Sequence, residues 1–250
     1  MPKLLDATGM DVTSIPGLSG YQFSSVRTDR LGASEYTLVT IAVDLSSSVR
    51  GFQDLLAGSV KKAVDACRKS PKANNILLRV IGFASDVTEI HGFKPLSEID
   101  NSVYDKLNPQ GMTALFDAAA SAIGAMIQYG KRLQDQDFGV NGILFLITDG
   151  DDNTSTYTAA VVGQQAADAV SGETLESFLS VLVAVNATEH EAVLRAFQQG
   201  AGITQYVDAG DATPGNLAKM AAFVSRSVSS QANAQGTGQA AQLPSLSVVI

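Results

Sequence analysis

Runs of apolar, largely β-branched residues alternate along the chain with segments whose apolar residues recur at helical spacing. The three longest runs cover residues 36–43, 76–84 and 142–148. A run with no polar alternation is typical of a strand that is buried on both faces, as in a parallel sheet covered by helices. The sequence therefore predicts an α/β fold: a doubly wound, Rossmann-like, mostly parallel sheet with helices on both faces.

Shorter elements complete this alternation. Strands are predicted at residues 87–91, 178–185 and 203–207, and helices between Ser48 and Ser70, within 95–107, from near Thr113 through Ile127, and at 157–171, 188–199 and 214–228. We expect one domain over residues 35–228. Residues 1–34 are interpreted as an N-terminal extension partly ordered against it. Residues 229–250 are interpreted as a flexible linker with an apolar tip.

Composition narrows the class of protein. The chain has 250 residues, of which 45% are hydrophobic and 17% charged, so it can bury a core. Its apolar runs all fall well short of the roughly 20 residues that cross a bilayer, which predicts no membrane partner. A net charge of −8 argues against a nucleic-acid partner. The single cysteine, Cys67, and an N-terminus without a basic-then-apolar pattern favour the cytoplasm.

Polar motifs stand where two long strands end and where a helix begins. Asp44-x-Ser46-x-Ser48 follows the first strand, Asp149 follows the third, and Thr113 opens a helix after a glycine-containing loop. In such sheets, ligands bind beyond the carboxyl ends of the strands. Taken singly, each motif has a plainer interpretation, because serine and threonine cap helices and aspartate is common in turns. Together they predict one site.

These residue types suit a hard divalent cation. Mg²⁺ takes oxygen ligands in near-octahedral geometry. Two carboxylates balance its charge, and the hydroxyls add none, so the metal keeps its attraction for an incoming carboxylate. The site contains no cysteine or histidine, which argues against Zn²⁺. Asp151 and Asp152 are interpreted as solvated turn charges. We therefore expect Mg²⁺, with Mn²⁺ or Ca²⁺ as alternatives.

The same residues carry a resemblance to a known family. Residues 36–228 resemble a von Willebrand factor type A domain, and Asp44, Ser46, Ser48, Thr113 and Asp149 match its metal-ion-dependent adhesion site (MIDAS) one by one. The resemblance implies a six-stranded sheet of order 3-2-1-4-5-6 whose third strand is an antiparallel edge. It also implies Mg²⁺ or Mn²⁺ and a partner protein that supplies a carboxylate to the metal. The family often has glycine where Ser47 stands, which alters the shape of the loop.

Three functions remain open. The first is a non-catalytic, metal-dependent protein-binding module, an adaptor or scaffold, because the sequence lacks a nucleophile–base pair and a phosphate-binding loop. The second is a Mg²⁺-dependent phosphatase or hydrolase resembling haloacid dehalogenases. Ser46 weakens this alternative, because it replaces the second aspartate of their pattern. The third is a scaffold subunit that works with an AAA+ ATPase or a larger assembly.

The apolar tip has two interpretations. Leu246-Ser-Val-Val-Ile250 is short, uncharged and rich in β-branched residues. Such a peptide can add as a strand to an exposed sheet edge of a neighbour. The alternative is a disordered or self-docked tail.

Overall fold

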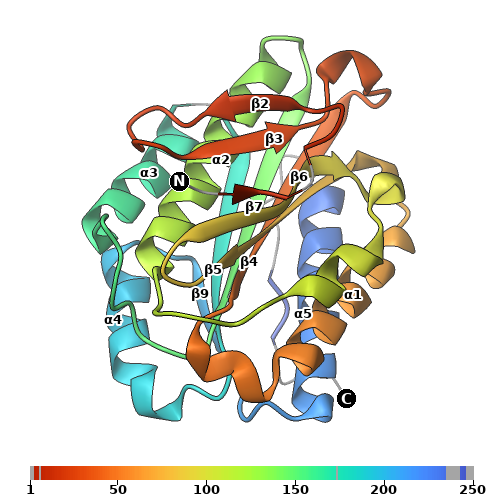
Figure 1. The fold of residues 1–250 in the computed structure, drawn as a ribbon. Helices are drawn as coiled ribbons and strands as arrows, with labels where there is room; N and C mark the ends of the chain where they lie inside the picture. The colour runs from red at the N-terminus through yellow and green to blue at the C-terminus, as the bar shows by residue number, and fades with distance from the viewer. Residues whose placement is uncertain (1–2, 6, 173, 235–242, 246–250) are drawn as a thin grey trace.

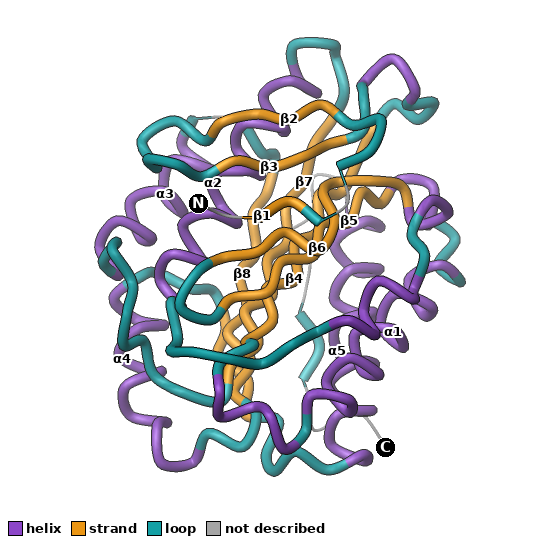
Figure 2. Tube along the Cα trace, viewed as in Figure 1, coloured by secondary structure: helices purple, strands orange, loops and turns teal. Residues whose placement is uncertain are grey.

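A computed structural model describes residues 3–5, 7–172, 174–234 and 243–245. A twisted sheet of nine strands crosses the centre of the molecule, and helices cover both of its faces (Figure 1; Figure 2). The predicted fold class is confirmed.

Six strands form the main sheet: β4 (Glu35–Asp44), β5 (Ile76–Phe83), β6 (Val87–Pro95), β7 (Gly139–Thr148), β8 (Ser177–Ala184) and β9 (Gln205–Asp208). Their spatial order is β6-β5-β4-β7-β8-β9, and all neighbours are parallel except β5 and β6. This is the expected 3-2-1-4-5-6 order. It places β4 and β7 side by side, so Asp44 and Asp149 leave the sheet at the same edge.

The helices divide into two layers because each long strand buries alternate residues on opposite faces. On β7, Leu144 and Leu146 pack in one core, and Ile143 and Phe145 pack in the other. The first core contains α2 (Leu115–Gln134), α3 (Ala159–Ser171) and α4 (Glu191–Gly200). The second contains α1 (Gln53–Arg68) and α5 (Pro214–Ala234). Figure 1 shows these two groups on opposite sides of the sheet.

Short helical turns join these elements. They are 3₁₀ helices: η1 (Thr28–Arg30), η2 (Ser47–Gly51), η3 (Ala73–Asn75), η4 (Leu96–Glu98), η5 (Asn101–Lys106) and η6 (Thr188–His190). η4 and η5 stand where one short helix was predicted within residues 95–107. Helix α5 is longer than the predicted 214–228, so residues 229–234 are helical rather than part of a linker.

The N-terminal residues extend the sheet beyond the six predicted strands. β1 (Lys3–Leu4) pairs in parallel with β6, and β2 (Asp11–Ser14) and β3 (Gln22–Ser25) form an antiparallel pair. β3 then joins β6 where Ser25 pairs with Phe93. The expectation that the third strand is an edge is therefore wrong. β6 is antiparallel, but the N-terminal strands cover its outer side.

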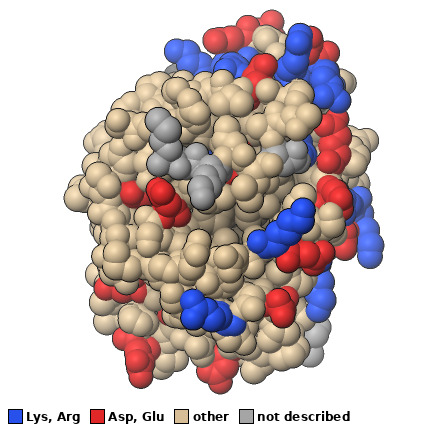
Figure 3. Space-filling model, in the orientation of Figure 1, with Lys and Arg blue, Asp and Glu red and all other residues tan. Residues whose placement is uncertain are grey.

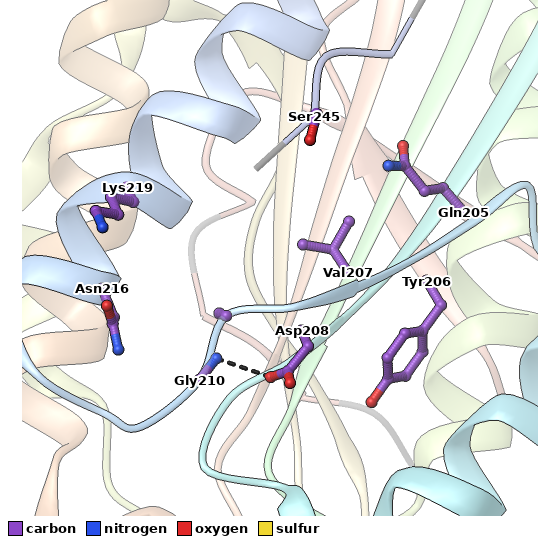
Figure 4. Close-up of a pocket in the computed structure, with 9 residues that line it drawn as sticks. Gln205, Tyr206, Val207, Asp208, Gly210, Asn216, Lys219 and Ser245 are labelled. Carbon is purple, nitrogen blue, oxygen red and sulfur yellow. Dashed lines mark hydrogen bonds between the residues drawn. The ribbon is translucent and has the colours of Figure 1, made fainter. Parts of the chain in front are cut away.

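The opposite end of the sheet is formed by β9. β9 pairs only with β8 among the described residues. A groove of about 480 Å³ runs beside it, and Val207, Asp208, Asn216, Lys219 and Ser245 are among its lining residues (Figure 4). Leu243 packs against the second core, so the chain returns to the domain just before the apolar tip. Residues 246–250, for which strand addition was considered, lie outside the described residues.

The charged surface mixes both signs. Figure 3 shows basic side chains beside acidic ones on one face. Exposed ion pairs of the described residues include Arg30–Glu98 (3.1 Å). The absence of a nucleic-acid partner stays a prediction. Among the helices of the described part of the chain, none has the length and apolar character needed to span a bilayer.

Candidate metal centre

Asp44 is the last residue of β4, and its carboxylate is held on both oxygens. Oδ1 accepts a hydrogen bond from the Ser46 backbone N–H (2.8 Å), and Oδ2 accepts one from the Thr148 hydroxyl at the end of β7 (2.6 Å). Asp44 has no exposed surface. Burial raises the pKa of Asp44 to about 6, and the charge of Asp149 adds to the rise, although the bonds from Thr148 and Ser46 oppose it.

A row of oxygen atoms joins the two strand ends. The hydroxyls of Ser46 and Ser48 lie 2.8 Å apart, and the Ser48 hydroxyl donates to Oδ1 of Asp149 (2.8 Å). Ser46 and Asp149 are buried, whereas Ser48 is exposed. Burial raises the pKa of Asp149, and the hydrogen bond from Ser48 opposes the rise. Three of the predicted ligands therefore stand in one hydrogen-bonded row that reaches the surface at Ser48.

The loop that carries Thr113 lies against the Asp44 loop. Gln110 N–H donates to the Leu45 carbonyl (2.8 Å), and Ser47 N–H donates to the Gly111 carbonyl (3.1 Å). Gly111 has a φ of 80°, and a Cβ there would overlap the Ser85 hydroxyl, so glycine is required twice over. The backbone of this loop is thus bonded directly to the segment that carries the two serines.

Thr113 itself joins the site through its backbone. Its N–H donates to Oδ1 of Asn153 (2.8 Å), and its carbonyl accepts from Asn153 N–H (3.0 Å). Asn153 lies four residues after Asp149. Within the described part of the chain, no hydrogen bond joins the Thr113 hydroxyl to the serines or to the two carboxylates. Its role as a ligand stays a prediction.

The donor set fits a hard cation. Adjacent ligands of an octahedral Mg²⁺ ion with bonds of 2.0–2.1 Å stand about 2.9 Å apart. The two 2.8 Å hydrogen bonds along Ser46, Ser48 and Asp149 have the ordinary O–H···O length, and they hold the oxygens at a spacing that such an ion can use. The described residues contain no group of three or more His, Cys, Asp or Glu side chains that could hold a metal. A cation here would therefore depend on hydroxyl oxygens as well as on carboxylates.

A pocket opens beside this row of oxygens. It has a volume of about 470 Å³, and Ser48 and Asp149 line it together with Asn186, Thr188, Glu189 and His190. The last four residues follow β8, in and just before η6. Asn186 adopts a φ of 55°, a left-handed backbone conformation that asparagine tolerates better than most residues. The candidate site is therefore open to a ligand on the side of η6.

Sequence reasoning missed several supporting residues. Thr148 was assigned only to a strand, although its hydroxyl holds the Asp44 carboxylate. Asp152 was interpreted as a solvated turn charge, but its Oδ1 accepts a hydrogen bond from the Phe116 N–H in the first turn of α2 (3.2 Å). A polar residue that ends a buried strand beside Asp149 was the available signal for Thr148.

Comparison with known proteins gives a fold but no sequence family. No protein-family profile and no curated protein sequence matches the chain. Among solved structures, the D319A mutant of the PilB minor pilin from Streptococcus sanguinis superposes with a TM-score of 0.60 at 15% identity. That match covers 86% of this chain and 66% of the pilin.

Of two further solved structures with a similar fold, one is described as a von Willebrand factor domain and the other as holding a metal ion. The von Willebrand factor domain of the type V pili tip protein Mfa5 from Porphyromonas gingivalis has a TM-score of 0.53 at 9% identity, covering 79% of this chain and 96% of that one. The chain has a von Willebrand factor type A-like fold. Proximal thread matrix protein 1 of the mussel byssus, with a zinc-occupied MIDAS motif, has a TM-score of 0.52 at 19% identity. That match covers 77% of this chain and 46% of the matrix protein.

Proposed function

We propose that the chain is a metal-dependent protein-binding module. The observation that carries the proposal is the convergence of side-chain oxygens from two neighbouring strand ends, in one row along Ser46, Ser48 and Asp149 beside an open pocket. With Asp44 and Thr113, these residues would hold one divalent cation. The bound ion would supply an electrophilic position for a carboxylate of a partner protein.

The chain's own residues prepare this position. The Thr148 hydroxyl and the Ser46 N–H fix the direction of the Asp44 carboxylate. Ser48 is exposed and already directed towards Asp149. The residues of η6 form the far wall of the pocket, with exposed Glu189 and half-buried His190. A partner's acidic side chain that enters between Ser48 and η6 would reach the oxygen row.

The choice of metal is part of the proposal. Mg²⁺ is favoured because all five donors are hard oxygen atoms and the two carboxylates balance its charge. Zinc is the alternative to test, because the mussel matrix protein with a similar fold is described with zinc in its MIDAS. The lack of cysteine and histidine among the five donors argues against zinc, whereas the zinc described in this protein of similar fold supports it.

A pair of neighbouring serines tests the metal site. Ser46→Ala removes a buried hydroxyl of the oxygen row, whereas Ser47→Ala removes an exposed one in the same loop and keeps its backbone bond to Gly111. By calorimetry, we expect Ser46→Ala to weaken Mg²⁺ binding by at least about tenfold and Ser47→Ala to leave it unchanged. Wild-type protein that takes up neither Mg²⁺ nor Mn²⁺ at millimolar concentration contradicts the proposal.

A capture experiment then tests the second part of the proposal, which is that a partner protein binds through the metal. Candidate partners are retained on immobilised protein in Mg²⁺ and washed with EDTA. A specific partner should be released by EDTA and should fail to bind Ser46→Ala. A partner that binds equally well in EDTA and to both variants contradicts a metal-dependent mode.

The two alternative functions, a Mg²⁺-dependent phosphatase or hydrolase and a scaffold subunit beside an AAA+ ATPase, are supported to different degrees. The proteins with similar folds are named as pilins, a pilus tip protein, an adhesin and a thread matrix protein, which supports binding over catalysis. Turnover of generic phosphate esters that is lost in Asp44→Asn would favour the phosphatase alternative. Work beside an AAA+ ATPase is compatible with metal-dependent docking and stays a prediction.

The cellular compartment also stays a prediction. The cysteine content, a single buried Cys67, favours the cytoplasm. The pilus and byssus names of the proteins with similar folds support an extracellular setting as the alternative.

A further inference from the structure

The N-terminal hairpin, which consists of β2, β3 and the turn between them, packs on α2. Within the turn, the Ile15 N–H donates to the Tyr21 carbonyl (2.9 Å), and Ile15, Leu18 and Tyr21 belong to the first core. A Cβ on Gly124 of α2 would lie 2.5 Å from Cγ2 of Ile15. Glycine at this position allows the hairpin to approach the helix closely.

One buried carboxylate joins this hairpin to the loop that follows Asp149. Asp117, in the first turn of α2, is 5% exposed. Its Oδ2 accepts a hydrogen bond from the Tyr21 hydroxyl (2.9 Å), and its Oδ1 accepts from the backbone N–H groups of Thr156 (2.9 Å) and Tyr157 (2.8 Å). The Tyr157 hydroxyl in turn accepts from Ser19 N–H (3.0 Å). The hairpin, α2 and the loop therefore meet at Asp117.

The same loop is bonded to the candidate metal centre at its other end. Residues 149–157, which we name the Asp149 segment, lie along the start of α2. Asn153 exchanges two hydrogen bonds with Thr113, and Asp152 accepts from Phe116 N–H. The contacts at Asp117 thus continue a series of bonds that begins at a predicted metal ligand. Tyr21 stands at the end of that series.

We propose that Tyr21 is a positioning residue for the candidate metal centre. Its hydroxyl donates a hydrogen bond to Oδ2 of Asp117. Oδ1 of the same carboxylate then accepts from the backbone N–H groups of the Asp149 segment. A buried carboxylate that loses a donor must find another or turn. Tyr21 therefore fixes where Asp149 stands relative to Ser48 and Thr113. The inference rests on the proposed function, since it assigns a role at the same metal site.

Two buried tyrosines give a matched test. Tyr21→Phe removes the hydroxyl at Asp117. Tyr129→Phe removes a hydroxyl that also joins α2 to the N-terminal extension, by donating to the Val26 carbonyl (2.8 Å), but that has no hydrogen bond to the Asp149 segment. Calorimetry with Mg²⁺ alone measures affinity, and hydrogen exchange measures the protection of the Thr156 and Tyr157 amides.

We expect Tyr21→Phe to weaken Mg²⁺ binding on the order of fivefold and to speed exchange at Thr156 and Tyr157. Tyr129→Phe should change neither, although both variants lose some stability. Unchanged exchange at the two amides in Tyr21→Phe, or unchanged affinity, overturns the positioning role while the metal site stands. If the wild-type protein binds no Mg²⁺, the proposed function itself fails, and this inference falls with it.

Discussion

Replacing Asp44 by asparagine should stabilise the metal-free protein at neutral pH. The Asp44 side chain has no exposed surface, and burial is the largest cause of its raised pKa. Asparagine has the same shape and no charge, and its carbonyl can accept from the Ser46 N–H as Oδ1 does. The Thr148 hydroxyl lies 3.0 Å from the Gly150 carbonyl, so it can donate there and accept from the new amide. The substitution removes a buried charge and leaves the hydrogen bonds.

The size of the effect follows from the pKa. A rise from 3.8 to about 6 is about two units, and each unit is worth about 1.4 kcal/mol. Between these two values the unfolded chain holds fewer protons at this residue than the folded chain, so the free energy of unfolding falls as pH rises. The loss begins near pH 4 and is complete just above pH 6, where it reaches about 3 kcal/mol.

Urea unfolding in EDTA at pH 5 and pH 8 measures this difference. Comparing wild type with Asp44→Asn removes the contribution of other titrating groups. The stability advantage of the variant should grow by on the order of 1 kcal/mol from pH 5 to pH 8, because Asp44 of the folded protein is mostly protonated at the lower pH. An advantage that is equal at both pH values, or a variant that is less stable at pH 8, refutes the reasoning.

Two further predictions concern the buried ion pair between β5 and β6 and the C-terminal tip. Arg79→Met removes the partner that contacts buried Glu89 at 2.7 Å. We expect the free energy of unfolding, measured in urea, to fall by about 3–5 kcal/mol. A fall of less than about 1 kcal/mol contradicts a paired buried charge. Deleting residues 244–250 should reduce self-association in light scattering if the tip adds to the β9 edge of a second copy, and an unchanged mass at every concentration removes that idea.

The main sheet could be predicted because its signals are local. The buried strands β4, β5 and β7 are mostly apolar runs without polar alternation, and their apolar residues alternate between two cores as parallel strands do. The positions of Asp44 and Asp149 could be predicted for the same reason. Asp44 ends one run and Asp149 follows another, and the topology brings neighbouring strand ends together.

Contacts between segments far apart in the sequence leave no local pattern from which they could be predicted. Tyr21 and Asp117 are separated by 96 positions, and neither residue belongs to a motif. The end of α5 was missed for a different reason. The composition of residues 229–234 is typical of a linker, but buried Gln231 donates to Ser177 Oγ (2.7 Å) and to the Gly142 carbonyl (3.2 Å). Tertiary hydrogen bonds fix the helix there, beyond what local composition indicates.

Strand β6, the third strand of the predicted order, is not an edge because N-terminal strands pair with it. Glu89 on β6 is fully buried, and its two oxygens need separate partners. Arg79 on β5 contacts Oε2, while the backbone N–H and hydroxyl of Ser24 on β3 donate to Oε1 (2.9 and 2.6 Å). Without β3, half of this carboxylate would lose its donors, and an exposed β6 would present unpaired backbone groups. The buried charge pair and the N-terminal hairpin therefore depend on each other. The hairpin, whose Tyr21 donates a hydrogen bond to Asp117 of α2, is part of the folded domain.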